Sequence, residues 1–244
     1  MSNIKLILEY DGTEYAGWQR QDNAITVQQV LEEALARLTG EDITVIASSR
    51  TDSGVHARGQ TVNFHTRSSI PPEKYSFALN ALLPPDIRVV SSERVADDFH
   101  SRYSAKGKKY RYCMVVGPHG TAIGHRYYAH ITPPLDIEAM EQSCRHFIGT
   151  HDFAAFRATG SPVKSTVRTI FDASLERDGR YLYFVVKGDG FLYNMVRIMA
   201  GTLIYVGKGK IKPDEIPEIL LSRDRRRAGI TAPAHGLILE EVYY

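Results

Sequence analysis

The stretch TVQQVLEEALARLTG, residues 26–40, carries the clearest helix signal in a chain of 244 residues. Its apolar side chains recur at helical spacing on one face, Thr26 and Gln29 form a capping box, and Gly40 suits the C-cap. Alternating apolar residues predict strands on either side of this helix, at residues 4–9 and 43–47. A helix between two strands is therefore the unit from which the rest of the fold is built.

Strands and helices stay intermixed along the rest of the chain. Asp178 and Gly179 separate two apolar runs and predict a hairpin with a type I′ turn. Intermixed hairpins and helices favour an α+β fold with a largely antiparallel sheet. We place a boundary near residue 104, which divides the chain into halves 1–104 and 105–244. The predicted strands span 60–66, 87–95, 110–116, 167–176, 181–187 and 237–243, and the predicted helices span 71–83, 136–147, 191–205 and 213–222.

The amino-acid composition is that of an ordinary globular protein, with 43% hydrophobic and 24% charged residues. The net charge of +2 excludes a histone-like polycation, although it leaves room for a local basic face that binds nucleic acid. Cys113 and Cys144 lie far apart, which excludes a disulfide scaffold and a zinc ribbon and fits a reducing cytosol. We therefore expect a cytoplasmic protein.

The sequence also argues against a membrane span and a bound cofactor. The longest apolar run, residues 191–206, contains Asn194 and Arg197 and is short for a bilayer, so we expect no membrane span. The glycines form no dinucleotide-binding or Walker loop, and the nine histidines show no zinc spacing. We therefore expect no organic cofactor and no metal.

The stretch SSRTDSGVHA, residues 48–57, is the first candidate site, because it lacks hydrophobic periodicity and lies between two predicted strands. Asp52 beside Arg50 is either a catalytic carboxylate on a functional loop or an ordinary surface Asx-turn, with Gly54 supplying a positive φ. Asp52, Ser53 and Gly54 also match the D-S/T-G signature of aspartic proteases. Those enzymes need two such carboxylates, and this chain has one such tripeptide, so a protease would have to be a dimer.

Arg197 is the second candidate, because it lies inside the predicted apolar helix 191–205. A buried guanidinium requires an anionic partner. Two interpretations stay open at this point. Arg197 extends to a helix end or pairs with any nearby acid, or it pairs with Asp52 and keeps that carboxylate ionised.

The stretch SRYSAKGKKYRY, residues 101–112, holds five basic residues, three tyrosines and no acid. Cations that bind phosphates and rings that stack on bases suit nucleic-acid binding. The alternative is an ordinary strand edge protected by lysines. The stretch RDRRR, residues 223–227, leaves a similar choice between a second basic patch and a solvated helix end.

The octapeptide RTDSGVHA, residues 50–57, resembles the pseudouridine synthase A family, the tRNA pseudouridine synthases that act in the anticodon stem-loop. That family reads G-R-T-D-A/S-G-V-H-A here. Ser49 stands where the family usually has glycine, and it would strain the loop if that position needs a positive φ. Further motifs of the family are matched in order at residues 9–12, 17–21, 99–105, 109–112, 152–157, 191–201 and 231–237.

The resemblance implies a pseudouridine synthase fold, in which two ferredoxin-like or RNA-recognition-like halves share an extended, mainly antiparallel sheet with a central cleft. It implies an isomerase that converts uridine to pseudouridine at positions 38–40 of the tRNA anticodon stem-loop. It further implies a homodimer that binds tRNA and uses neither a metal nor an organic cofactor.

Carried over to this sequence, the resemblance makes Asp52 the catalytic nucleophile. Tyr110 stacks on the target uracil and acts in deprotonating C5, Arg197 pairs with Asp52, and Arg50 displaces or holds the flipped base. The carboxylate attacks either C6 of the ring or C1′ of the sugar, and the residues alone do not decide which. The substrate-binding residues implied are Tyr110, Arg50, His56, Arg20, Arg157, Arg102 and Lys109.

Two other functions use the same residues. A non-catalytic RNA-binding module would use the basic aromatic stretch and would not need Asp52. A dimeric aspartic protease would need Asp52 but would not bind tRNA.

Overall fold

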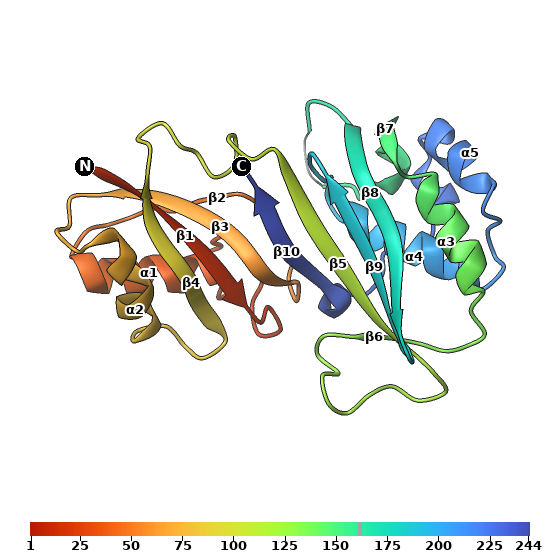
Figure 1. Cartoon of the computed structure of the whole chain (residues 1–244), viewed down its shortest axis with the longest axis horizontal. Helices are drawn as coiled ribbons and strands as arrows, with labels where there is room; N and C mark the ends of the chain where they lie inside the picture. Colours follow the sequence, from red (N-terminus) through yellow and green to blue (C-terminus); the bar gives the residue numbers. More distant parts are fainter. Residues whose placement is uncertain (161–162) are drawn as a thin grey trace. The chain divides into compact units, whose positions relative to one another are not determined.

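The computed structural model describes residues 1–160 and 163–244, which form two compact units (Figure 1). Unit 1 comprises Met1–Lys106 together with Leu239–Tyr244, and unit 2 comprises Gly107–Ile238. The sequence-based halves, 1–104 and 105–244, differ from this grouping at the C-terminus. The reason is local packing, because the Tyr244 hydroxyl donates to the Ser101 carbonyl over 2.8 Å and its ring lies 4.9 Å from that of Phe99.

Unit 1 is a sheet with strand order β4-β1-β3-β10, with β2 beside β3 and helices packed against it. β1 lies between β3 and β4 and pairs with both in antiparallel register, so that Leu6 lies opposite Val62 and Ser92. α2 packs against β4 and contacts α1 (Figure 1). The elements are β1 (Ser2–Tyr10), α1 (Val27–Thr39), β2 (Ile46–Ala47), β3 (His56–Thr66), the 3-10 helix η1 (Pro72–Lys74), α2 (Tyr75–Asn80), β4 (Ile87–Val95) and β10 (Leu237–Tyr243), of which Leu239 onward belongs to unit 1.

The predicted helix at residues 26–40 is confirmed as α1. The Thr26 side chain accepts a hydrogen bond from the Gln29 amide, and Gly40 ends the helix with φ 73°. The neighbouring strand predictions were less accurate. The predicted strand 43–47 is reduced to Ile46–Ala47, and β3 begins at His56 rather than at residue 60. Pairing with β1 extends β3, since Ala57 lies opposite Tyr10.

In unit 2 the strand order is β5-β9-β8-β7, with β6 beside β5. α3 packs on α4 and on β8, and α4 contacts β5. The elements are β5 (Gly107–Val116), β6 (Ala129–Ile131), α3 (Ile137–Arg145), β7 (Gly149–Asp152), η2 (Ala154–Phe156), β8 (Val167–Asp178), β9 (Tyr181–Gly188), α4 (Met195–Gly207), α5 (Glu215–Ser222), η3 (Arg225–Arg227) and η4 (Ala234–Gly236).

The β8–β9 hairpin exists, but its predicted turn was wrong. Asp178 pairs with Tyr181, so the turn residues are Gly179 and Arg180. Gly179 has φ 57°, whereas Arg180 is not among the residues with positive φ. A type I′ turn needs positive φ at both central positions, which Gly-Arg does not supply here.

Both units combine helices with a sheet, which confirms the α+β class with mainly antiparallel pairing. Among the strand pairs whose register the structure describes, β5–β6 alone is parallel. The central cleft stays a prediction. Within residues 1–160 and 163–244, no helix is long and apolar enough to cross a membrane.

Candidate functional site

The loop that carries Asp52 is anchored in unit 1 through its neighbour Thr51. The Thr51 hydroxyl lies 2.7 Å from the Tyr10 hydroxyl, and the Thr51 carbonyl accepts the Trp18 amide over 3.0 Å. Thr51 is buried, whereas Asp52 is half-buried and Arg50 is exposed. The buried threonine therefore fixes the backbone from which the carboxylate and the guanidinium project.

Two glycines of the N-terminal segment allow this loop to approach closely. A Cβ built on Gly12 would overlap the Val55 carbonyl oxygen. A Cβ on Gly17, which has φ 87°, would lie 2.6 Å from the Thr51 carbonyl oxygen. Since both neighbours are backbone atoms, a larger residue would displace the loop. The motifs at residues 9–12 and 17–21 therefore act locally as a support for Asp52.

The loop turns at Asp52 and its backbone is relaxed at Ser49. The Val55 amide donates to the Asp52 backbone carbonyl over 3.1 Å, and Gly54 has the predicted positive φ, 76°. Among the described residues, the non-glycine positions with positive φ are Asn194 and Arg223. Ser49 is not one of them, so the strain that a positive φ would have imposed does not arise.

His56 is a buried part of the same support, with 3% of its surface exposed. Its Nδ1 accepts the Gly12 amide over 3.0 Å and lies 3.1 Å from Asp11 Oδ1. The Gly12 amide and the Asp11 carboxylate thus both contact the same ring nitrogen. This burial favours a role in fixing the loop, and the tRNA contact of His56 stays a prediction.

Arg197 lies in unit 2, in the first turn of α4, because the helix begins at Met195 rather than at residue 191. Eleven of the thirteen residues of α4 are buried, and Arg197 is one of the two that are only half-buried. Its Nε donates to the Ala232 carbonyl over 2.8 Å, and its Nη1 donates to Asn194 Oδ1 over 2.7 Å. These neutral oxygens offset part of the cost of removing the guanidinium from water.

Tyr110 lies on β5 in unit 2, with 7% of its surface exposed. Its ring meets Phe191 edge to face, with centroids 5.1 Å apart. Tyr112, two residues along the strand, donates its hydroxyl proton to the Pro233 carbonyl over 2.9 Å. Burial raises the pKa of Tyr112 above its usual value, so this hydroxyl keeps its proton and remains a donor at neutral pH.

The remaining predicted contacts are divided between the two units. In unit 1, Arg20 is half-exposed and its Nη1 lies 3.1 Å from Glu32, and Arg102 is exposed with its guanidinium over the Tyr103 ring at 5.7 Å. In unit 2, Lys109 and Arg157 are half-buried. The structure thus groups Arg50, Asp52 and His56 on one loop and strand. The pairing of Asp52 with Arg197 would join the two units and stays a prediction.

Sequence reasoning missed the groups that support these side chains. Tyr10, Gly12, Gly17 and Ala232 make contacts with residues at least 34 positions away, and their own sequence patterns do not reveal them. The available signal was the pair of glycines near aromatic residues in the N-terminal motifs. Within the described residues, no group of three or more His, Cys, Asp or Glu side chains could hold a metal ion.

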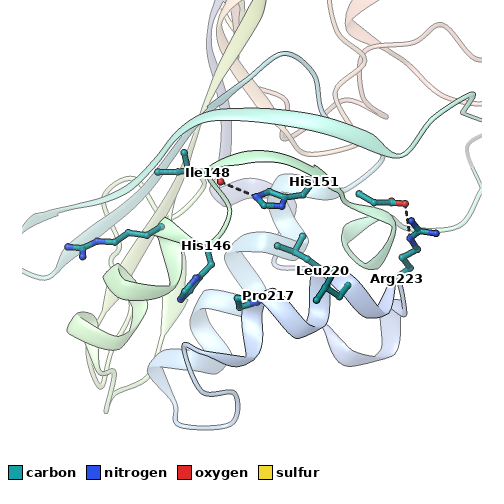
Figure 2. A pocket seen from close by; sticks show the side chains of 9 residues that line it. His146, Ile148, His151, Pro217, Leu220 and Arg223 are labelled. Carbon is teal, nitrogen blue, oxygen red and sulfur yellow. Dashed lines mark hydrogen bonds and ion pairs between the residues drawn. The ribbon is translucent and has the colours of Figure 1, made fainter.

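Unit 2 also contains a pocket of about 570 Å³ beside α5 (Figure 2). Arg223 and Asp152 form an ion pair of 2.9 Å at one side, and His151 lies 2.9 Å from the Ile148 carbonyl. Its lining includes none of the sequence-predicted site residues, all of which lie in the described part of the chain. The lining residues are Arg145, His146, Ile148, His151, Asp152, Pro217, Leu220, Leu221 and Arg223.

Comparison with known proteins gives a consistent result. A family model described as tRNA pseudouridine synthase matches residues 6–104 and 143–244. The chain is 56% identical to the tRNA pseudouridine synthase A of Acetivibrio thermocellus, with all of both chains covered. It is 52% identical to the protein of that name from Ruminiclostridium cellulolyticum and 50% identical to that from Thermoanaerobacter sp. strain X514, again over the full length of each.

Proposed function

Since this chain belongs to the tRNA pseudouridine synthase family, we propose that it isomerises uridine to pseudouridine at positions 38–40 of the tRNA anticodon stem-loop, with Asp52 as the nucleophile. The observation that carries this proposal is the support of the Asp52 loop. Thr51 is hydrogen-bonded to Tyr10 and Trp18, and the next residue in the sequence is Asp52, whose side chain is half-buried. A fixed backbone limits the positions that the Asp52 carboxylate can take, which supports a role as nucleophile.

The proposed reaction breaks the N1–C1′ bond of uridine and forms a C5–C1′ bond. A free aspartate carboxyl is ionised at neutral pH, so Asp52 needs no general base. The carboxylate attacks C6 of the ring or C1′ of the sugar, and its bond to the substrate is broken again before the product leaves. Between these steps the detached base rotates so that C5 faces C1′, and the C5 proton is then lost.

The proposed roles of the other residues follow from these steps. Arg197 pairs with Asp52 and favours its charged form when water is excluded. The Tyr110 ring stacks on the uracil, and its oxygen receives the C5 proton as the hydroxyl gives up its own proton to water. Arg50 is exposed and helps to displace or hold the flipped base. The N-terminal half, 1–104, would supply the nucleophile loop and the C-terminal half, 105–244, would supply Tyr110 and Arg197.

We further propose that the protein is a cytoplasmic homodimer that binds tRNA. The proposed tRNA contacts are made by Arg20, His56, Arg102, Lys109 and Arg157 in addition to Tyr110 and Arg50. Light scattering of the purified protein tests the dimer.

One assay tests the chemistry. Pseudouridine formation replaces the C5 hydrogen with the sugar, so tRNA labelled with tritium at uracil C5 should release label in proportion to product. We expect release without an added cofactor and in the presence of chelator. Asp52→Asn should abolish release while tRNA binding persists. Asp98→Asn, which changes an exposed carboxylate of the same unit, is the matched control and should release label at the wild-type rate.

The outcomes separate the alternatives. A non-catalytic RNA-binding module would bind tRNA and release no label from any variant. Release that survives Asp52→Asn would keep the isomerase and overturn Asp52 as nucleophile. Mapping of the pseudouridines in the product tRNA by mass spectrometry tests the positions 38–40.

A further inference from the structure

The basic cluster at residues 223–227 contains one arginine whose partners differ from those of its neighbours. Three of its arginines pair with carboxylates: Arg223 with Asp152 at 2.9 Å, Arg226 with Asp224 at 2.7 Å, and Arg227 with Glu218 at 3.2 Å. Arg225 instead donates from Nη1 to the Gly229 carbonyl over 2.8 Å and from Nη2 to the Thr231 hydroxyl over 3.2 Å. This guanidinium therefore binds neutral oxygens of the chain that follows it.

Arg225 is also partly removed from water, and burial lowers its pKa from the usual value. A planar guanidinium that donates to two oxygens restrains their relative position, which a single flexible ammonium does not do. The restrained residues, Gly229 and Thr231, lie in the first half of residues 228–236, a segment that we call the strap.

The strap is packed tightly onto α4 at its first half. A Cβ on Gly201 would overlap the Ile230 carbonyl oxygen, and a Cβ on Gly229 would lie 2.6 Å from the backbone of Gly201. The Gly229 amide donates to the buried Thr202 hydroxyl over 2.9 Å, and that hydroxyl donates to the Ile198 carbonyl over 2.7 Å. Backbone contact at this spacing leaves the strap little freedom to slide along the helix.

The second half of the strap contacts Arg197. Ala232 donates its amide to the Arg197 carbonyl over 3.1 Å, and its own carbonyl accepts Arg197 Nε over 2.8 Å. Pro233, the next residue, accepts the Tyr112 hydroxyl. Ala232 directly follows Thr231, which is bound by Arg225. A continuous series of contacts thus connects Arg225 to the guanidinium of Arg197.

We infer that Arg225 is a positioning residue that fixes the Arg197 guanidinium through the strap. The inference rests on the proposed function for the role of Arg197 in turnover. Its physical basis is that an error of about 1 Å in a group near the reacting atoms costs roughly 100-fold in rate. Loosening the strap should therefore slow turnover without weakening tRNA binding.

The first experiment compares Arg225→Ala with Arg226→Ala. Both variants remove one positive charge from the same cluster, but Arg226 is exposed and pairs within its own turn. We expect kcat to fall about 10- to 100-fold in Arg225→Ala, with the Kd for tRNA within about 2-fold of wild type. Arg226→Ala should keep the wild-type kcat. Arg225→Lys keeps the charge but has one donor nitrogen in place of the planar guanidinium, so it should recover part of the lost kcat.

A second experiment measures positioning without activity. Side-chain NMR of the ¹⁵N-labelled protein resolves the Nε–H of arginine, and its exchange with water reports the Arg197–Ala232 hydrogen bond. Exchange of the Arg197 signal should speed up in Arg225→Ala and not in Arg226→Ala. If Arg225→Ala does not fold, Thr231→Val removes only the contact of Arg225 with the Thr231 hydroxyl, and the same acceleration of Arg197 exchange is expected in it.

A third experiment places Arg225→Ala in an Arg197→Lys background. If Arg225 acts through Arg197, kcat should fall no further in the double variant, whereas independent roles would multiply. Wild-type exchange of Arg197 in the strap variants, or equal loss of tRNA binding in Arg225→Ala and Arg226→Ala, overturns the positioning role. Faster exchange together with full turnover of Arg197→Lys supports the positioning role and overturns the proposed catalytic use of Arg197.

Discussion

In unit 1 the charged candidate, Asp52, lies on an irregular loop that its surroundings fix. In unit 2 the charged candidate, Arg197, lies on a regular helix, and the irregular segment is the strap that fixes it. Both arrangements use glycines at backbone contacts, Gly12 and Gly17 against the loop and Gly201 against the strap. The structure thus fixes the Asp52 loop at the backbone of Thr51, whereas on α4 the Arg197 side chain itself donates to the Ala232 carbonyl and to Asn194 Oδ1.

The comparison teaches that the same packing device serves two different needs. Around Asp52 the close glycine packing fixes the backbone from which the side chain projects, through the buried Thr51. Around Arg197 the close glycine packing fixes the position of the guanidinium at the tip of the side chain, through the Ala232 carbonyl. Changes in the two regions should therefore have measurably different consequences.

After the complete loss expected in Asp52→Asn, the largest effect is expected from Tyr110→Phe, which removes the proposed proton acceptor in unit 2 and keeps the ring. General base catalysis is worth roughly 100- to 10,000-fold, so turnover should fall by at least about 100-fold while tRNA binding persists. Tyr103→Phe, at a tyrosine of unit 1 that is 76% exposed, is the control and should be silent. Single-turnover tritium release checks both, and a wild-type rate in Tyr110→Phe would remove its oxygen from the mechanism.

The glycine contacts should differ in strength between the two units. Gly12→Ala forces the loop away from Val55 and should cost roughly 3 kcal/mol of unfolding free energy. Gly201→Ala meets a similar overlap with Ile230, but alanine gains about 1 kcal/mol in a helix, so its net cost should be about 2 kcal/mol.

Urea unfolding measures these costs. Trp18 is the single tryptophan and lies in unit 1, so its fluorescence reports that unit, while circular dichroism reports both. Gly120→Ala is the control, because a Cβ there would make ordinary contacts at 3.6 Å. The comparison fails if Gly201→Ala lowers only the transition seen by Trp18.

Two threonine substitutions compare the loop and the strap again, with smaller expected changes in the free energy of unfolding. Thr202→Val leaves the Gly229 amide without its buried acceptor and should cost about 2 kcal/mol. Thr51→Val removes a contact between two hydroxyls and should cost about 1 kcal/mol. Both changes conserve shape, so the ratio of the two costs in thermal unfolding is the measurement. A larger cost at Thr51 would show that the loop, not the strap, is the more tightly restrained segment.

The smallest effect concerns Asp224, which is bonded to the side chain and amide of Arg226. These bonds lower the pKa of Asp224 to about 2. The lowered pKa means that this contact contributes to stability above the ordinary aspartate range and is lost as the pH falls through about 2. Arg226→Gln should raise the pKa toward 3.8, part of the way because the amide bond remains. Carbon NMR titration checks this, and turnover should not change.

Local signals in the sequence were reliable where the physics is local. The caps of α1 and the start of α3 were both predicted, and Asp136 indeed accepts the Ala139 amide. The class of fold followed from the intermixed strands and helices. The loop around Asp52 was found first by its lack of hydrophobic periodicity and then by its resemblance to a known family, and it lies between β2 and β3.

The predictions were wrong where contacts with residues distant in sequence decide where an element begins. β3 starts at His56 because Ala57 pairs with Tyr10, and no pattern at 48–57 predicts that pairing. α4 starts at Met195 although the apolar run begins at Phe191, which instead packs its ring on Tyr110. For the cluster at 223–227 the sequence left a choice between a basic patch and a solvated helix end, and the structure gives each of its arginines a partner within the chain.

The sequence by itself determined the helix caps, the α+β class and the identity of the chemical groups, because periodicity and capping depend on neighbours within a few residues. Only the tertiary structure decided how those groups are fixed. Gly12 meets Val55 and Gly201 meets Ile230 across long stretches of chain, and the Arg197 guanidinium finds its acceptor at Ala232. These are contacts of backbone atoms, which every residue carries alike, and their pairing is set by the path of the folded chain.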